Sequence, residues 1–184
     1  MTEIRPLRLD DTRELAELHL GVWRAAYGGL VRPEGFDTVD LDERTERWRQ
    51  TVRGEADPPR TAYVADDAGT LVGFVVVGVP RDDDVPAATG EVYAIYVAEE
   101  RWGSEVGHRL LQAGRAHLVG EGLDRVCLWV LEDNPRARRF YERAGLSSDG
   151  TRKDVDLFGT VLPELRYAGP AAFADGPSGA HSSS

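Results

Sequence analysis

"EERWGSEVGHRLL", residues 99–111, joins the apolar run 91–97 to a segment with helical periodicity. This order of strand, glycine loop and helix is typical of a phosphate-binding site, because the N–H groups at a helix start and the helix dipole attract anions. Gly103 and Gly107 would let the backbone approach a phosphate closely. Glu105 instead places a carboxylate in the loop. The stretch therefore predicts an anion site weakened by one charge or, taken alone, an ordinary helix start.

A second informative segment, "LEDNPRARRFYERAGL", covers residues 131–146. Asn134 or Asp133 suits the N-cap of a helix that ends before Gly145. Tyr141 lies seven residues after Asn134, so the two side chains share one helix face, two turns apart. A tyrosine can donate a proton to a leaving group, and an asparagine can bind a ligand amide. The spacing alone, however, favours a helix cap and a core aromatic residue.

The remaining pattern predicts an α/β (α+β) domain with one mixed, mostly antiparallel central sheet and helices on both of its faces. Runs of β-rich residues alternate with segments of helical periodicity, and a parallel strand pair is expected where helices intervene. In chain order the predicted elements are a strand in 3–11, helices in 10–27 and 41–52, strands in 61–80 and 91–97, a helix ending at 120, a strand in 124–132, a helix in 133–145, and strands in 151–159 and 162–168.

Length and composition indicate one folded domain. With 184 residues, of which 41% are hydrophobic, the chain is large enough for a single core. We assign the domain to residues 1–168. Residues 169–184 are rich in glycine, proline and serine, so we expect them to form a disordered tail.

Charge and cysteine content limit the class of partner and the compartment. The net charge of −10 argues against a nucleic-acid partner, because phosphate binding needs a basic surface, and it favours a cationic substrate such as an amine. No apolar run is long enough for a membrane span, and Cys127 is the single cysteine. We therefore expect a cytoplasmic protein with no membrane partner. The four histidines and Cys127 lack metal-ligand spacing, so no metal site is expected.

Taken together, the element order and the two segments resemble the GNAT superfamily of N-acetyltransferases over roughly Glu3 to Ala168. In that family a loop of the pattern Arg/Gln-x-x-Gly-x-Gly/Ala binds the pyrophosphate of acetyl-coenzyme A (acetyl-CoA). Here the pattern falls on residues 102–107, with Trp102 in place of Arg or Gln and Glu105 in place of the middle glycine. The second segment matches the family almost throughout. The resemblance implies the GNAT fold, with acetyl-CoA as cosubstrate.

The resemblance also implies roles for individual residues. The central strand would pair its backbone with the pantetheine arm, and the loop would face the pyrophosphate. The implied coenzyme-binding residues are Ile95, Tyr96, Val97, Gly103, Ser104, Glu105, Val106, Gly107, His108 and Asn134. Asn134 would lie near the thioester, and Tyr141 would be the general acid that protonates the departing thiolate. Glu91 is the candidate general base. Trp23 and Tyr27 would line the acceptor pocket or pack in the core.

The expected activity is direct transfer of an acetyl group from acetyl-CoA to a primary amine of a small molecule or a peptide N-terminus. The alternative is a non-catalytic domain of the same fold, whose degenerate pyrophosphate loop serves ligand sensing or partner binding. Glu105 and Trp102 favour this alternative, whereas Asn134 and Tyr141 oppose it. Transfer of a larger acyl group is also consistent with these residues, and a homodimer fits by analogy with the family.

Overall fold

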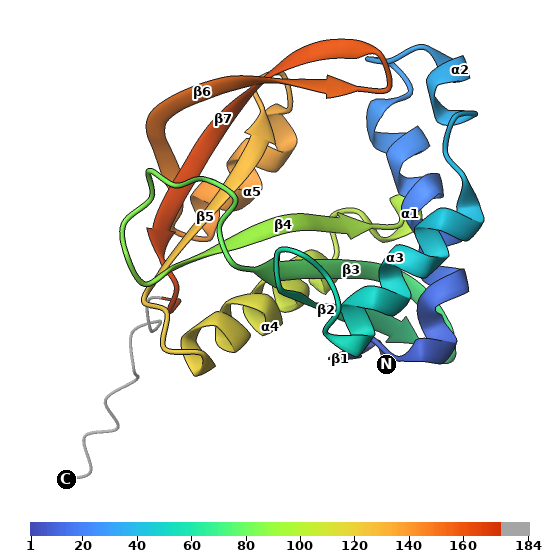
Figure 1. Ribbon diagram of the computed structural model, residues 1–184, viewed down its shortest axis with the longest axis horizontal. Coiled ribbons are helices and arrows are strands. Elements are labelled where there is room, and N and C mark those ends of the chain that lie inside the picture. The colour runs from blue at the N-terminus through green and yellow to red at the C-terminus, as the bar shows by residue number, and fades with distance from the viewer. Residues whose placement is uncertain (174–184) are drawn as a thin grey trace, which may run out of the picture.

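The computed structural model describes residues 1–173, which form one sheet with helices on both faces (Figure 1). The seven strands lie in the order β1-β2-β3-β4-β5-β7-β6. They are β1 (Glu3–Pro6), β2 (Arg60–Asp67), β3 (Thr70–Gly78), β4 (Thr89–Val97), β5 (Arg125–Leu131), β6 (Ser147–Leu157) and β7 (Thr160–Pro170). The α-helices are α1 (Thr12–Tyr27), α2 (Pro33–Phe36), α3 (Leu41–Arg53), α4 (Val106–Gly120) and α5 (Pro135–Arg143). The predicted mixed, mostly antiparallel sheet is confirmed.

The sheet is antiparallel except where β4 meets β5. These two strands pair in parallel through only four residues, from Thr89 with Arg125 to Val92 with Leu128. Next along β4, Tyr93 is an extra residue in the ladder with β3, and such a bulge bends a strand. Beyond it β4 continues beside β3, whereas β5 turns away beside β7 (Figure 1). The two strands therefore separate and leave an opening in the sheet.

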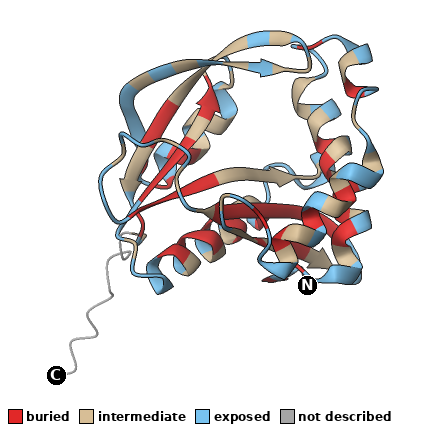
Figure 2. Ribbon diagram, in the orientation of Figure 1, coloured by how far each residue is buried: buried red, intermediate tan, exposed pale blue. Residues whose placement is uncertain are grey.

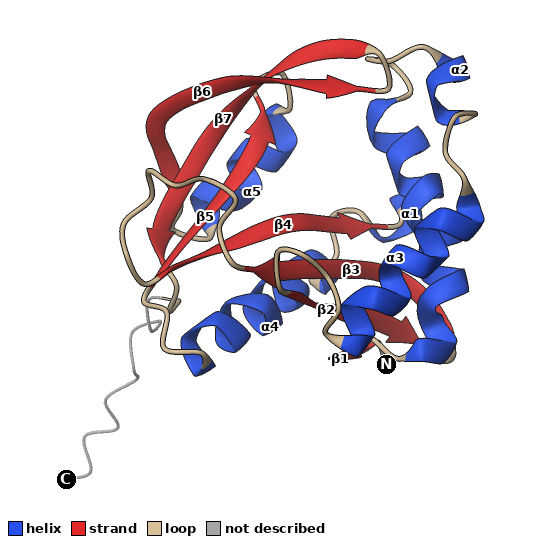
Figure 3. Ribbon diagram, viewed as in Figure 1, coloured by secondary structure: helices blue, strands red, loops and turns tan. Residues whose placement is uncertain are grey.

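Two apolar clusters cover the two faces of the sheet. One joins α4 and α5 to β3 and β5, through Leu110, Leu118 and Val126 among others. The other joins α1 and α3 to β2 and β3, around Leu15 and Phe74. Strand β3 contributes to both clusters and is buried along most of its length (Figure 2), as expected for a strand covered on both faces. Figure 3 shows α1 and α3 together on one side of this part of the sheet and α4 on the other.

Helix α4 lies very close to the sheet. A Cβ added at Gly114 would lie 2.8 Å from Val77 Cγ1, so this position on the helix needs a residue without a side chain. The close approach places the start of α4 beside the end of β4, where the opening lies (Figure 1).

Among residues 1–173, no helix combines the length and apolar character that a membrane crossing needs.

Arg115 of α4 joins the end of α5 to the end of β7. Its side chain is 1% exposed and donates four hydrogen bonds of 2.6–2.8 Å to backbone carbonyls. The acceptors are the carbonyl oxygens of Ala144, Pro170, Ala171 and Ala172. Burial lowers the pKa of Arg115 to about 10, which leaves the guanidinium charged at neutral pH.

The folded part of the chain therefore extends past the predicted boundary at Ala168. Strand β7 ends at Pro170, and Ala171 is fully buried. The first two residues of the predicted tail, Gly169 and Pro170, belong to the sheet because they pair with β5, and Pro170 and Ala171 supply acceptors for Arg115. The rest of that predicted tail, 174–184, lies outside the described residues.

We predict that Arg115→Met destabilises the protein by about 3 kcal/mol, because four carbonyl groups lose a charged donor and some stay buried without a partner. Arg109→Met on the same helix is the matched control. Its guanidinium donates one hydrogen bond, to the Thr2 carbonyl, so its loss should cost less than about 1 kcal/mol. Urea denaturation followed by circular dichroism measures both values, and equal losses would contradict the role given to Arg115.

Candidate active site

A cavity of 610 Å³ occupies the opening between β4 and β5. Its walls are β4, the loop from 101 to the start of α4, β5 and α5. Eleven of the predicted site residues line it, namely Tyr27, Ile95, Tyr96, Val97, Gly103, Ser104, Glu105, Gly107, His108, Asn134 and Tyr141. Glu91, Trp23 and Val106 do not. The two sequence segments therefore meet at one site.

One wall of this cavity is a free strand edge. Residues 93–97 of β4 lie beyond the last pair with β5, so their backbone groups on that side have no strand partner among the described residues. The other edge of β4 pairs with β3 through Gly73 to Gly78. An unpaired strand edge can bind an extended, amide-containing ligand as an added strand. Ile95, Tyr96 and Val97 are held in this position.

The start of α4 forms a second wall. Gly103 has φ +78°, a left-handed conformation that a glycine adopts without strain. Ser104 Oγ donates to the Arg101 carbonyl at 2.6 Å and lies 3.4 Å from the Val106 nitrogen. The Val106 side chain itself is buried in the core. The first turn of a helix has N–H groups without intrahelical acceptors, so this turn presents donors to the cavity.

Two charges of opposite sign lie beside that turn. Glu105 is the N-cap residue of α4 and is exposed, so its carboxylate is solvated. The Arg136 guanidinium lies 3.5 Å from the centre of the Trp102 ring, and Arg136 lines the cavity. A cation from the first turn of α5 therefore lies against Trp102, whose indole N–H donates to the Val97 carbonyl at 2.9 Å. Arg136 was not among the predicted site residues, and its only signal in the sequence was its position two residues after Asn134.

Asn134 and Tyr141 both lie where their helix faces the cavity. Asn134 caps α5 through a 3.0 Å hydrogen bond from the Ala137 N–H to its Oδ1, which confirms the predicted cap. Burial, with a smaller contribution from Tyr96, raises the pKa of the Tyr141 phenol. Tyr141 is therefore protonated at neutral pH and can act as a proton donor. Nearby, the hydroxyls of Tyr27 and Tyr96 lie 2.6 Å apart.

The structure does not support Glu91 as a general base. Its side chain is 0% exposed and lies outside the cavity lining. Both carboxylate oxygens accept hydrogen bonds from Arg81, one from the backbone N–H at 2.8 Å and the other from the guanidinium. A base needs a free lone pair within reach of the substrate proton, so we withdraw this assignment. Glu91 instead anchors the start of the β3–β4 loop.

A second cavity of 410 Å³ lies between α1, α3 and the β6–β7 hairpin, and Trp23 and Trp48 line it. The residues common to both cavities are Tyr27, Tyr93, Ala94, Tyr96, Trp129 and Glu164. Burial raises the pKa of Glu164 above the ordinary value, although Lys153 and Arg81 oppose the shift. Glu164 is thus a half-buried carboxylate where the cavities meet, a position typical of a catalytic base. Glu164 was not among the residues predicted from the sequence.

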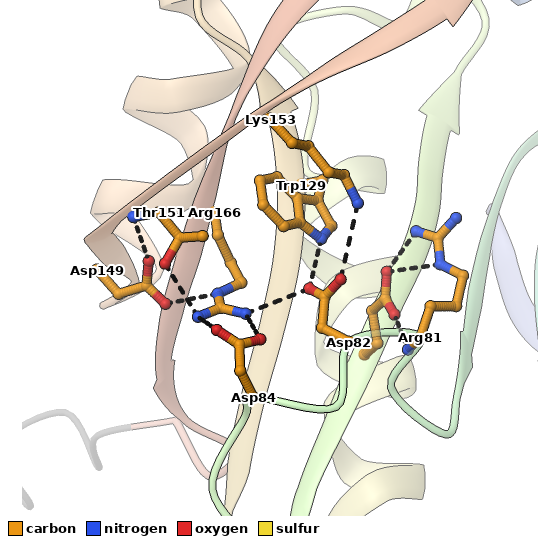
Figure 4. A network of polar contacts seen from close by, with 9 residues as sticks. Arg81, Asp82, Asp84, Trp129, Asp149, Thr151, Lys153 and Arg166 are labelled. Carbon is orange, nitrogen blue, oxygen red and sulfur yellow. Dashed lines mark hydrogen bonds and ion pairs between the residues drawn. The ribbon is translucent and has the colours of Figure 1, made fainter.

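An ion-pair network around Arg166 joins the loop 80–88 to β6 and β7 (Figure 4). Arg166 of β7 binds Asp84 in bidentate fashion at 2.6 and 2.9 Å, and it donates to Asp149 at 2.6 Å. Asp82 accepts a hydrogen bond from Trp129 Nε1 at 2.8 Å. The loop 80–88, which the sequence presents as a simple acidic loop, is therefore held against β5 and β7. This contact also orients the Trp129 ring, which lines both cavities.

Within residues 1–173, no three His, Cys, Asp or Glu side chains come together as a metal site. Cys127 is buried in β5.

Comparisons with known proteins connect this geometry to a family. The model of the acetyltransferase (GNAT) family matches residues 18–146. An uncharacterized N-acetyltransferase of Bacillus subtilis, YuaI, is 29% identical over 137 residues, which are 73% of this chain and 75% of that protein. A mycothiol acetyltransferase of Mycobacteroides abscessus is 41% identical over 131 residues. That match covers 70% of this chain and 40% of the longer protein, so the chain spans less than half of this relative.

Solved structures share the fold at lower identity. The PaiA N-acetyltransferase of Thermoplasma acidophilum, in complex with coenzyme A, has a TM-score of 0.69 and 21% identity, covering 90% of this chain and 98% of that chain. An N-acetyltransferase of Staphylococcus aureus has a TM-score of 0.70 and 18% identity, covering 94% of this chain and 99% of that chain. These likenesses confirm the predicted architecture.

We predict that Arg166→Met releases the loop 80–88, because Asp82 and Asp84 lose their guanidinium partner. Backbone amides in this loop should exchange hydrogen at least about tenfold faster, as local opening becomes easier. The Arg166 guanidinium also lowers the pKa of Asp84. In the natural protein the Arg166–Asp84 ion pair is therefore fully formed above the ordinary carboxyl pKa, and it is lost as the pH falls through the lowered pKa.

Hydrogen–deuterium exchange followed by mass spectrometry measures this effect, with Arg152→Met as the control. Arg152 is an exposed β6 arginine paired with Glu132, and its loss should leave the loop unchanged. Unchanged exchange in Arg166→Met would contradict the anchoring role.

Proposed function

Because this chain belongs to the acetyltransferase (GNAT) family, we propose that it is an N-acetyltransferase that uses acetyl-CoA. The acceptor is a primary amine of a small molecule or a peptide N-terminus, and transfer is direct. The observation that carries the proposal is the cavity between β4 and β5, where a free strand edge, a helix start and Tyr141 converge. Few other ligands need all three features in one place.

The coenzyme fits the walls of this cavity by its chemistry. The pantetheine arm contains amide groups, which pair with the free backbone edge of Ile95 to Val97. The pyrophosphate binds the N–H groups of 103–108 at the start of α4, and Arg136 adds a positive charge. The Glu105 carboxylate opposes this binding, but solvent screens it. Asn134, which lines the cavity at the start of α5, contacts the coenzyme near the reacting thioester.

The reaction needs one base and one acid. Glu164 accepts a proton from the acceptor ammonium group, directly or through water, so that the neutral amine can attack the thioester carbonyl. A C–N bond forms, the C–S bond breaks, and Tyr141 donates its proton to the departing thiolate. The second proton, released by the new amide nitrogen, passes to the Tyr141 phenolate directly or through water and restores the acid. The raised pKa of Glu164 suits a base, because it brings this carboxyl closer to neutral pH, and the Tyr141 phenol is protonated there and has a proton to donate.

We predict that the protein binds acetyl-CoA with micromolar affinity in calorimetric titration. Glu105→Gly should bind about fivefold more tightly, the effect of removing one solvated like charge. Arg136→Gln should bind about tenfold more weakly, because a charge-assisted contact with phosphate is lost. Arg139→Gln on the same helix is the control, since this arginine is exposed and lies outside the cavity lining.

The outcomes of this titration separate the candidate functions. Binding only after Glu105→Gly would mean that the natural site is switched off and would favour the non-catalytic alternative. Absence of binding in both forms would contradict the coenzyme site itself.

We predict that Glu164→Gln lowers kcat/KM by at least about a hundredfold and removes the acid limb of the pH–rate profile. In the natural protein the rate falls as the pH drops through the raised pKa of Glu164, because the protonated carboxyl cannot accept a proton. Release of coenzyme A thiol with a primary amine such as β-alanine measures the rate. Tyr141→Phe should lower kcat while acetyl-CoA binding is retained.

Glu132→Gln is the control for Glu164→Gln. Glu132 pairs with Arg152 and lies outside the lining of both cavities, so neither the rate nor the profile should change. An acid limb that survives in Glu164→Gln would place the base elsewhere.

A further inference from the structure

The second cavity has a charge opposite to that of the whole protein. The chain carries a net charge of −10, yet this cavity is lined by Arg44, Arg47, Arg60, Arg81 and Lys153. Glu164 is the one acidic residue in the lining, and it lies where this cavity meets the first cavity, between β4 and β5. The walls come from α3, β2, β6 and the β3–β4 loop, so the positive charge results from the fold and not from one basic run of sequence.

Three of these cations already have anionic partners. Arg81 binds the buried Glu91, and Arg47 pairs with Glu43 at 2.6 Å on the helix surface. Lys153 lies 3.8 Å from Asp82. Arg44 and Arg60 form no ion pair within residues 1–173. Two positive charges in the cavity are therefore available to a ligand.

Arg44 is held in place by aromatic and imidazole contacts. Its guanidinium lies 4.2 Å from the centre of the Trp23 ring, and Nη1 lies 3.4 Å from His19 Nδ1. Its Nε is buried without a hydrogen-bond partner in the described residues. Burial, and to a smaller extent the neighbouring Arg47, lower the pKa of Arg44. A guanidinium kept half-buried without a carboxylate has unfavourable solvation, which an anionic ligand would relieve.

His19 adds a second unpartnered group at the same wall. It is 6% exposed, and its Nε2 has no partner in the described part of the chain. Burial and the nearby Arg44 charge lower the pKa of His19 far below its ordinary value, so the ring is neutral. A neutral ring whose Nδ1 accepts from Arg44 presents Nε2–H as a donor. His19 therefore holds the Arg44 guanidinium in place, and Arg44 is the group at this wall that can bind the oxygens of a carboxylate or phosphate.

From these contacts we infer that the second cavity binds the acceptor, and that the acceptor is an amine bearing a negatively charged group, carboxylate or phosphate. Arg44 binds the anionic group and Glu164 attracts the ammonium end. This inference rests on the proposed function and specifies the class of its substrate. It narrows the expected cationic amine to one that also carries an anionic group, because the local charge of the cavity is opposite to the net charge.

Matched pairs of amines test the inference. β-Alanine is compared with β-alaninamide, and O-phosphoethanolamine with ethanolamine, so that each pair differs in the anionic group. Binding is followed by tryptophan fluorescence, since Trp23, Trp48 and Trp129 line the cavity. At least one anionic amine should bind about tenfold or more tightly than its neutral partner. The two pairs separate a carboxylate preference from a phosphate preference.

Three variants assign the effect to the cavity. Arg44→Gln should abolish the preference for the anionic member of the pair, and Arg44→Lys, which keeps the charge, should retain part of it. Arg60→Gln, on β2, should weaken the preference without touching the contacts of Trp23. Arg49→Gln is the control, because Arg49 lies on α3 outside the cavity lining and pairs with Glu46. Thermal unfolding checks that each variant is folded.

The binding readout does not require turnover, so the two proposals can fail separately. Equal binding within both pairs, no detectable binding of either anionic amine, or an unchanged preference in Arg44→Gln overturns this inference, whatever the rate assay gives. Loss of acetyl-CoA binding and of thiol release overturns the proposed function. An anionic preference that is lost in Arg44→Gln supports the inference.

Discussion

The four-residue parallel pairing between β4 and β5 is the constraint on which the rest of this structure depends. Beyond Val92 the bulge at Tyr93 keeps β4 beside β3, while β5 follows β7. A longer ladder would close the sheet and satisfy the backbone edge of β4 internally. The short ladder instead leaves hydrogen-bonding groups facing a cavity, where an extended ligand can pair with them. The same separation allows α5 and the start of α4 to face one another across that cavity.

Several arginines hold this open arrangement together, each by a different contact. Arg115 joins the end of α5 to the residues that follow β7 by binding their carbonyl groups, and Arg166 ties the acidic loop 80–88 to the sheet. Arg136 lies over Trp102 and brings a positive charge to the start of α4. The planar, multidentate guanidinium suits carbonyls, carboxylates and aromatic rings alike. A chain with net charge −10 can therefore have locally cationic sites.

Glu105 illustrates how a binding loop can tolerate an unfavourable residue. The loop provides backbone N–H groups, and any residue except proline supplies one. Glu105 lines the cavity but is exposed, so water and salt screen its charge. The geometry of the turn is determined elsewhere, by the left-handed Gly103 and by the hydrogen bond of Ser104 to the Arg101 carbonyl. A substitution at the middle position of the loop therefore changes electrostatics and leaves the shape in place.

The sequence by itself determined the order of elements, the cap at Asn134, the helix start after Gly103 and the face that Tyr141 shares with Asn134, because periodicity and capping are local properties. Only the tertiary structure decided which distant side chains meet. Glu91 is a strand-start carboxylate in the sequence, but the fold buries it against Arg81. Glu164 reaches the junction of the two cavities because β7 pairs with β5 in the register Leu131 with Glu164. A one-residue slip of that register would turn the carboxylate to the other face of the sheet, and no local pattern specifies the pairing of strands so far apart in the chain.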